Sequence, residues 1–210
     1  AGDPGRGAPK VPRIAALILA AGQSRRMGAA NKLLAEIDGK AMLARVVEAA
    51  QASQISEIVA VTGHEAEAVG AILSDCGIGS VHNLDFTDGL STSVQAGIGA
   101  LGGDIDGVIV LLGDMPRISP GHIDRLIAAF NPVEGRAICV PTYQGKRGNP
   151  VLFAARFFAE MTTLGGDSGA KYLIGQHEDD LVEVAMENDA IFLDVDTPEA
   201  LAAIREASSD

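Results

Sequence analysis

The apolar positions along the chain follow two alternating patterns. Short, nearly continuous apolar runs are typical of strands buried on both faces of a parallel sheet, whereas apolar residues three or four positions apart predict amphipathic helices. The expected strands span residues 14–21, 57–63, 80–83, 107–114, 136–143, 181–185 and 190–196. The expected helices span residues 40–53, 64–75, 91–101, 119–130, 153–162, 167–176 and 197–207. Because strands and helices alternate, we expect a three-layer α/β fold, with a mostly parallel sheet and helices on both faces.

Capping residues support three of the expected helices. Ser119 stands directly before Pro120, and Thr197 directly before Pro198. A Ser or Thr cap followed by Pro at the first helical position is a strong start signal. Ser91 is a possible cap for the helix over residues 91–101.

One domain accounts for the whole pattern. The chain has 210 residues, a size suited to a single α/β domain, and we expect this domain to span residues 13–207. Residues 1–12 are rich in Gly and Pro and have no periodicity, so they are interpreted as a flexible tail or linker. No internal repeat is visible.

Charge and cysteine content narrow the functional classes. The formal net charge is −12, which disfavours binding to nucleic acid or to an anionic membrane surface. No apolar run is long enough to span a bilayer. The two cysteines, Cys76 and Cys139, lie far apart and outside any CxxC motif, which favours a reducing cytoplasm over a disulfide framework.

The first candidate site follows the first expected strand. A loop from Ala21 to Gly28 contains glycines and the cationic residues Arg25 and Arg26, and Lys32 follows it. Backbone N–H groups and cations in such a loop are suited to a triphosphate, although a solvated surface loop is an equally simple interpretation. Neither a G-x-G-x-x-G fingerprint nor a Walker A motif is present, which excludes the usual dinucleotide and P-loop sites.

Acidic residues follow two later strands and are candidate metal ligands. Asp114 comes at the end of the strand over 107–114, where a carboxylate is well placed for Mg²⁺. Asp194 and Asp196 would point to the same face of the expected strand over 190–196. Asp114 and Asp196 together could hold one Mg²⁺ that bridges nucleotide phosphates. Turn formation or helix capping would explain the same residues without a metal.

Six sequence blocks, in order, resemble those of one known family. They are LAAGQSRRMGAANK (residues 19–32), GLSTSVQAG (89–97), GDMP (113–116), GNPVLF (148–153), GDSGAK (166–171) and DVDTPEAL (194–201). Together they are similar to the molybdopterin nucleotidyltransferases and resemble most closely the branch that acts as molybdenum cofactor cytidylyltransferase. The resemblance implies a Rossmann-like nucleotidyltransferase fold of the nucleotide-diphospho-sugar transferase type. Lys171 stands where the family commonly has Arg, and Ala41 where it commonly has Pro.

The resemblance also implies a role for each matched residue. The nucleotide would be bound by Leu19, Ala20, Ala21, Gly22, Arg26, Lys32, Thr62, Gly63, Ser91 and Ser93. Lys32, Arg26 and Asp114 would be catalytic, with Asp114 and Asp196 as ligands of Mg²⁺. Asn149 and Asp167 would face the pterin of the acceptor.

The implied reaction is the Mg²⁺-dependent transfer of CMP from CTP to the terminal phosphate of molybdopterin. A molybdoenzyme or chaperone would be a possible recipient of the product. Guanylyl transfer to molybdopterin, or cytidylyl transfer to a sugar or polyol phosphate, would use the same loop and aspartate. An alternative of a different class is a chaperone that binds nucleotide or cofactor without turnover.

Overall fold

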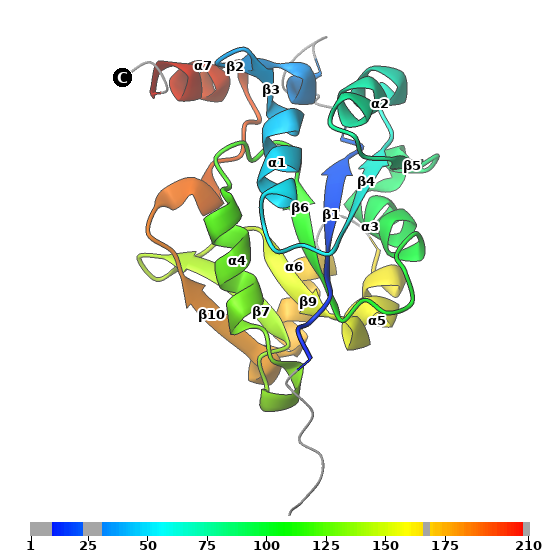
Figure 1. The fold of residues 1–210 in the computed structure, drawn as a ribbon, viewed down its shortest axis with the longest axis vertical. Coiled ribbons are helices and arrows are strands. Elements are labelled where there is room, and N and C mark those ends of the chain that lie inside the picture. Colours follow the sequence, from blue (N-terminus) through cyan, green and yellow to red (C-terminus); the bar gives the residue numbers. More distant parts are fainter. Residues whose placement is uncertain (1–9, 23–30, 166–168, 208–210) are drawn as a thin grey trace, which may run out of the picture.

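A computed structural model describes residues 10–22, 31–165 and 169–207. Within these ranges the main sheet has eight strands in the order β10-β7-β9-β6-β1-β4-β5, with β8 paired to β7 (Figure 1). The strands are β1 (Ile14–Ala20), β4 (Glu57–Thr62), β5 (Ser80–His82), β6 (Gly107–Leu112), β7 (Ile138–Tyr143), β8 (Lys146–Arg147), β9 (Val151–Ala154) and β10 (Leu181–Ala185). A separate two-stranded hairpin consists of β2 (Glu36–Ile37) and β3 (Lys40–Ala41).

The sheet is mostly parallel, as expected, with two antiparallel insertions. Strand β1 pairs parallel with β4 on one side and with β6 on the other, and β10 pairs parallel with β7. Strand β9 lies antiparallel between β6 and β7, and β8 forms an antiparallel hairpin with β7. The chain changes direction across the sheet at β1, and ligands of open α/β sheets bind at such a switch point.

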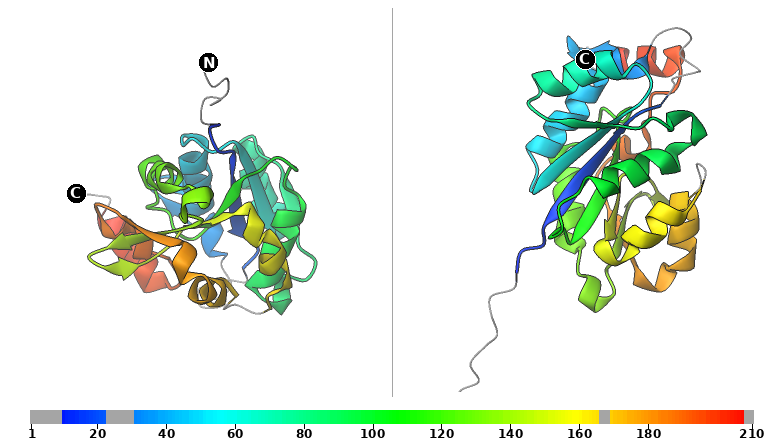
Figure 2. Two further views of the ribbon diagram at one scale, coloured as in Figure 1. Left: turned by 90° about the horizontal axis from the view of Figure 1, so that it is seen from below. Right: turned by 90° about the vertical axis from the view of Figure 1, so that its right-hand side faces the viewer.

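Helices cover both faces of the sheet, which confirms the three-layer α/β prediction (Figure 2). One face carries α1 (Met42–Gln51), α2 (Ala66–Asp75) and α4 (Pro120–Ala129); the other carries α3 (Leu90–Gly99), α5 (Phe158–Thr163) and α6 (Gly169–Gln176). Every residue of β1 is buried, because both of its faces are covered. No helix in the described ranges has both the length and the apolar character needed to cross a bilayer.

The last described helix, α7 (Pro198–Ala207), packs away from the main core. It shares a small apolar cluster with the β2–β3 hairpin and α1, formed by Ile37, Met42, Val195, Leu201 and Ile204. The Arg205 Nε also donates a hydrogen bond of 2.9 Å to the Glu36 carbonyl. In this cluster, Val195 of the segment before α7 packs with Ile37 of the β2–β3 hairpin and with Met42 of α1.

Two of the helix caps predicted from the sequence are confirmed, and one is wrong. The Ser119 hydroxyl accepts a bond from the His122 N–H, and the Thr197 Oγ1 accepts one from the Ala200 N–H. Ser91 is not a cap, because α3 already begins at Leu90. Gly89 precedes that helix with φ of 109°, a backbone conformation that glycine adopts more readily than other residues.

Two further predictions from the pattern are also wrong. Residues 153–154 belong to β9 rather than to a helix, because a short, fully buried apolar run fits a strand or a helix equally well. Residues 190–196 form no strand; a 3₁₀ turn (Asp189–Phe192) is followed by irregular backbone. Asn188 favours this turn, since its side chain accepts a hydrogen bond from the Ala190 N–H.

Two glycines of α3 test how tightly this helix packs on β1. A Cβ at Gly97 would overlap the Cδ1 of buried Leu17, whereas a Cβ at Gly99 would meet nothing within 4 Å. We expect Gly97→Ala to lower the free energy of unfolding by about 1–3 kcal/mol through overpacking. Gly99→Ala should raise it by up to about 1 kcal/mol through helix propensity and reduced chain entropy. Urea unfolding followed by circular dichroism measures both, and equal effects would contradict the close contact.

Candidate active site

Lys32, Asp114 and Asp196 meet at the carboxyl end of the parallel strands, although they lie far apart in sequence. Lys32 begins a 3₁₀ turn (Lys32–Leu34) whose cap is Asn31, the side chain of which accepts a 3.0 Å hydrogen bond from the Leu33 N–H. Asp114 comes two residues after β6, and Asp196 two residues before α7. The fold therefore brings together three of the residues that the sequence analysis selected.

Backbone hydrogen bonds fix the two aspartates relative to the sheet. The N–H of Gly113 donates to the carbonyl of Leu19 at 3.1 Å, which holds the end of β6 against the end of β1. The N–H of Val195 donates to the carbonyl of Asp114 at 2.9 Å, so the segment that carries Asp196 is joined directly to Asp114. Val195 is fully buried in the small cluster under α7, which anchors this segment from below.

The ammonium of Lys32 lies between the two carboxylates. Its Nζ is 2.7 Å from Asp114 Oδ2 and 2.5 Å from Asp196 Oδ1. The Lys32 and Asp114 side chains are only 14% and 16% exposed, so this ion pair is largely shielded from solvent. Burial lowers the pKa of Lys32, but the two carboxylates raise it more, and the pKa ends above its usual value. Lys32 therefore stays cationic at neutral pH.

A third carboxylate, Asp194, completes an acidic cluster. One oxygen from each of Asp114, Asp194 and Asp196 lies within 4.8 Å of the others. A hydrogen bond shared with Asp196, together with burial, raises the pKa of Asp194 to about 6. Burial raises the pKa of Asp114 as well, and Lys32 offsets only part of this effect. Three carboxylates facing one ammonium thus leave an excess of negative charge in a partly buried place.

These residues fit a hard divalent cation. Carboxylate oxygens are the ligands that Mg²⁺ and Mn²⁺ prefer. The Asp114 Oδ1 is buried and has no hydrogen-bond partner among the described residues, so this oxygen has a lone pair free for a ligand. The pair Asp194 and Asp196 was expected from a strand; the irregular segment brings the two side chains together by a different geometry.

The other residues expected to bind the nucleotide lie around the ends of β1, β4 and α3. Leu19, Ala20 and Ala21 are buried, and Gly22 is exposed directly after them. Thr62 and Gly63 are buried at the end of β4, where Phe86 packs against Gly63 closely enough to exclude a Cβ there. Arg26, predicted to bind phosphates, lies outside the described residues.

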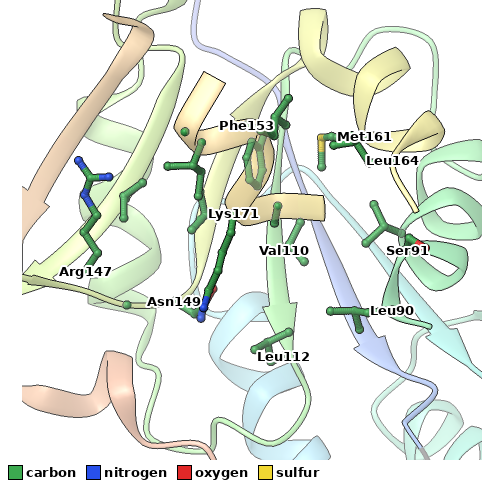
Figure 3. A pocket seen from close by; sticks show the side chains of 18 of the residues that line it. Leu90, Ser91, Val110, Leu112, Arg147, Asn149, Phe153, Met161, Leu164 and Lys171 are labelled. Carbon is green, nitrogen blue, oxygen red and sulfur yellow. The ribbon is translucent and has the colours of Figure 1, made fainter. Parts of the chain in front are cut away.

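The two serines of α3 differ in their surroundings. Ser93 is buried, and its Oγ accepts a 3.0 Å hydrogen bond from Asn83 Nδ2. Ser91 instead faces a cavity on the α3 side of the sheet (Figure 3). Asn83, which also donates to Thr92 Oγ1 at 2.8 Å, was missed by the sequence analysis, because a single Asn after a short strand carries no distinctive signal.

Asn149, expected to face the acceptor, lines that same cavity, which has a volume of about 490 Å³. Its floor is the face of β6 and β9, and its walls come from α3, α5 and α6 (Figure 3). The backbone N–H of Asn149 donates to the Ile191 carbonyl at 3.0 Å, which fixes the loop before β9. Asp167, the second residue expected to face the acceptor, lies outside the described residues.

The chain is similar to known proteins over most of its length. A model of the MobA-like NTP transferase domain matches residues 16–181. The purine catabolism protein PucB of Bacillus subtilis is 30% identical over 207 residues, which cover 94% of this chain and 98% of PucB. Nicotine blue oxidoreductase of Paenarthrobacter nicotinovorans is 27% identical over 198 residues, which cover 91% of this chain and 96% of that protein.

Among solved structures, Rv0371c of Mycobacterium tuberculosis H37Rv has a TM-score of 0.82 at 25% identity, over 94% of this chain and 100% of that one. A complex of Rv0371c with manganese has a TM-score of 0.79 at 25% identity, over 93% of this chain and 99% of that one. The family match includes the segments that supply Lys32 and Asp114.

Replacing Lys32 tests the charge balance of the cluster. We expect Lys32→Met to lower the free energy of unfolding by about 3 kcal/mol, because it leaves buried carboxylates without their cation. Millimolar Mn²⁺ should restore more stability to this variant than it adds to the wild type, since the ion would replace the lost charge. Thermal unfolding with and without Mn²⁺ measures both effects.

Lys40→Met is the matched control. Lys40 pairs with Glu48 at 2.6 Å, but these side chains are 45% and 49% exposed, so the loss should stay below about 1 kcal/mol. If Mn²⁺ stabilised the two variants equally, the ion would not replace the charge of Lys32.

Proposed function

Because this chain belongs to the MobA-like NTP transferase family and is a nucleotidyltransferase, we propose that it transfers CMP from CTP to the terminal phosphate of molybdopterin. The products are the cytosine dinucleotide and pyrophosphate. The observation that carries the proposal is the position of the Lys32 ammonium between Asp114 and Asp196, at the carboxyl ends of β1 and β6. This arrangement places a cation beside candidate metal ligands, as the alignment of a triphosphate requires.

Magnesium is the cofactor that we propose, with Asp114 and Asp196 as its ligands and Asp194 within reach. The unpartnered buried oxygen of Asp114 supports a ligand at this point. The related Rv0371c forms a complex with manganese, which supports a divalent ion as the cofactor. When bound, Mg²⁺ would neutralise charge on the phosphates and align them.

The reaction requires little proton transfer. The terminal phosphate of the acceptor is already anionic at neutral pH, so one of its oxygens attacks the α-phosphorus of CTP without a strong general base. A new P–O bond forms, the bond between the α-phosphorus and the bridging oxygen breaks, and pyrophosphate leaves with the electron pair. Catalysis then consists of positioning and charge stabilisation.

Lys32 supplies that stabilisation from the protein. Two carboxylates hold its cationic ammonium at a fixed position. From there the ammonium would contact a phosphate bound at the same edge of the sheet. The backbone of residues 19–22, which comprises the end of β1 and the two residues after it, would bind the nucleotide. We propose that Arg26 contacts the β- and γ-phosphates and that Thr62, Gly63, Ser91 and Ser93 surround the nucleoside.

Turnover of the variants tests these roles. We expect Lys32→Ala and Asp114→Asn each to lower the rate of pyrophosphate release by about 10²–10³, because each removes one group that stabilises developing charge. The assay contains CTP, Mg²⁺ and molybdopterin at a temperature at which circular dichroism shows each variant folded. Lys40→Ala is the control and should turn over at the wild-type rate. Undiminished turnover in either site variant would refute its role.

Nucleotide preference separates the proposal from its alternatives. We expect calorimetry with Mg²⁺ to give tighter binding of CTP than of GTP or ATP. Preference for GTP would identify a guanylyltransferase, and turnover only with a sugar or polyol phosphate would identify another acceptor class. Binding without any release of pyrophosphate would identify a chaperone that binds nucleotide or cofactor without turnover.

A further inference from the structure

The cavity beside Asn149 has more apolar surroundings than a phosphate site requires. Its floor consists of aliphatic and aromatic side chains, including Val110, Leu112, Val151 and Phe153. Leu173 of α6 also lines the cavity. At about 490 Å³ the cavity falls within the range of about 300–1,000 Å³ that is typical of small-molecule sites. The residues that line it therefore suit the flat, weakly hydrated body of a ligand rather than its charged end.

Two cations line this cavity, and their surroundings differ. The guanidinium of Arg147 donates to Glu178 at 2.8 and 3.0 Å and to Glu183 at 3.3 Å, so its charge is already balanced. Lys171 is exposed, and its ammonium makes no hydrogen bond or ion pair within the part of the chain described. Of these two cations, only Lys171 has its charge available to an anion.

The direction of Lys171 links the cavity to the acidic cluster. In Figure 3 the side chain extends from α6 toward the end of the cavity at which Asn149 and Leu112 lie. Leu112 is the last residue of β6, and Asp114 follows two residues later. An anion held by Lys171 would thus lie at the end of the cavity nearest to Lys32 and the carboxylates.

We propose that this cavity binds the ring of the acceptor and that Lys171 binds the acceptor's phosphate. The substrate class is a monophosphate ester whose flat ring presents apolar faces to Val110 and Leu173, with its polar edges toward Ser91 and Asn149. This inference rests on the proposed nucleotidyl transfer and adds the means by which the acceptor is selected.

The charge of Lys171 would offset the repulsion that the acceptor phosphate meets near the triphosphate. The acceptor phosphate must approach a second anion, the triphosphate, beside three carboxylates in a chain of net charge −12. A cation on the acceptor side lowers this repulsion and holds the attacking oxygen in place. The reaction balances as above: the acceptor oxygen bonds to the α-phosphorus, and pyrophosphate leaves.

Steady-state kinetics tests the role of Lys171. With CTP, Mg²⁺ and molybdopterin, Lys171→Met should raise the KM for the acceptor about tenfold, as expected when one charge-assisted hydrogen bond is lost. The KM for CTP should not change, and Lys171→Arg should restore acceptor binding. Lys40→Met is the control, since it removes an exposed lysine that does not line the cavity, and its acceptor KM should equal that of the wild type. An unchanged acceptor KM in Lys171→Met, or a rise in the KM for CTP alone, would overturn the proposal.

A binding assay separates this inference from the proposed function. The probe is 8-anilinonaphthalene-1-sulfonate, which combines aromatic rings with an anionic group, titrated by fluorescence without nucleotide or metal. We expect one site, about tenfold weaker binding in Lys171→Met, and loss of binding in Val94→Trp, in which the new ring fills the cavity from α3.

The two assays fail in different ways. If these binding results are obtained but molybdopterin gives no pyrophosphate, the cavity and Lys171 bind an anionic aromatic ligand, and the assignment of molybdopterin as the acceptor is wrong. If the probe binds Lys171→Met and Val94→Trp as tightly as the wild type, the cavity proposal is wrong, whatever the turnover.

Discussion

The contact between one ammonium and carboxylates from distant parts of the chain is the interaction on which the rest of the site depends. The carboxylates of Asp114 and Asp196 would repel each other in this partly buried place, and a cation between them offsets that repulsion. Lys32 supplies that cation from the segment between β1 and β2. In the proposed mechanism the same side chain balances the buried carboxylates and stabilises the bound phosphate.

Much of this arrangement is visible in the sequence, because it follows from local rules. A fully apolar β1 and the strand before Asp114 determine where the carboxyl ends of the central strands meet, and the caps at Ser119 and Thr197 mark two helices correctly. Lys32 and Asp114 could thus be selected before any coordinates. Asp196 was selected through a strand that does not exist; its position comes from the hydrogen bond between Val195 and Asp114, which no periodicity encodes.

The remaining features depend on long-range packing. Strand β9 lies antiparallel in a sheet whose other central strands are parallel, and its four apolar residues suit a helix as well as a strand. The cavity arises only when β6, β9 and the helices α3, α5 and α6 are assembled, so its apolar character could not be inferred from any one segment. The different surroundings of Arg147 and Lys171 likewise become visible only once Glu178 and Glu183 are placed beside Arg147.

The small cluster under α7 affects how long the acidic cluster stays assembled. Asp196 is anchored by a helix that borders a five-residue satellite core rather than the main one. Elements with few apolar contacts detach at lower free energy than the global unfolding of a domain. In the proposed mechanism, detachment of α7 would displace Asp196 and stop turnover while the sheet stayed folded, so the lifetime of the active state would depend on this helix rather than on the stability of the whole fold.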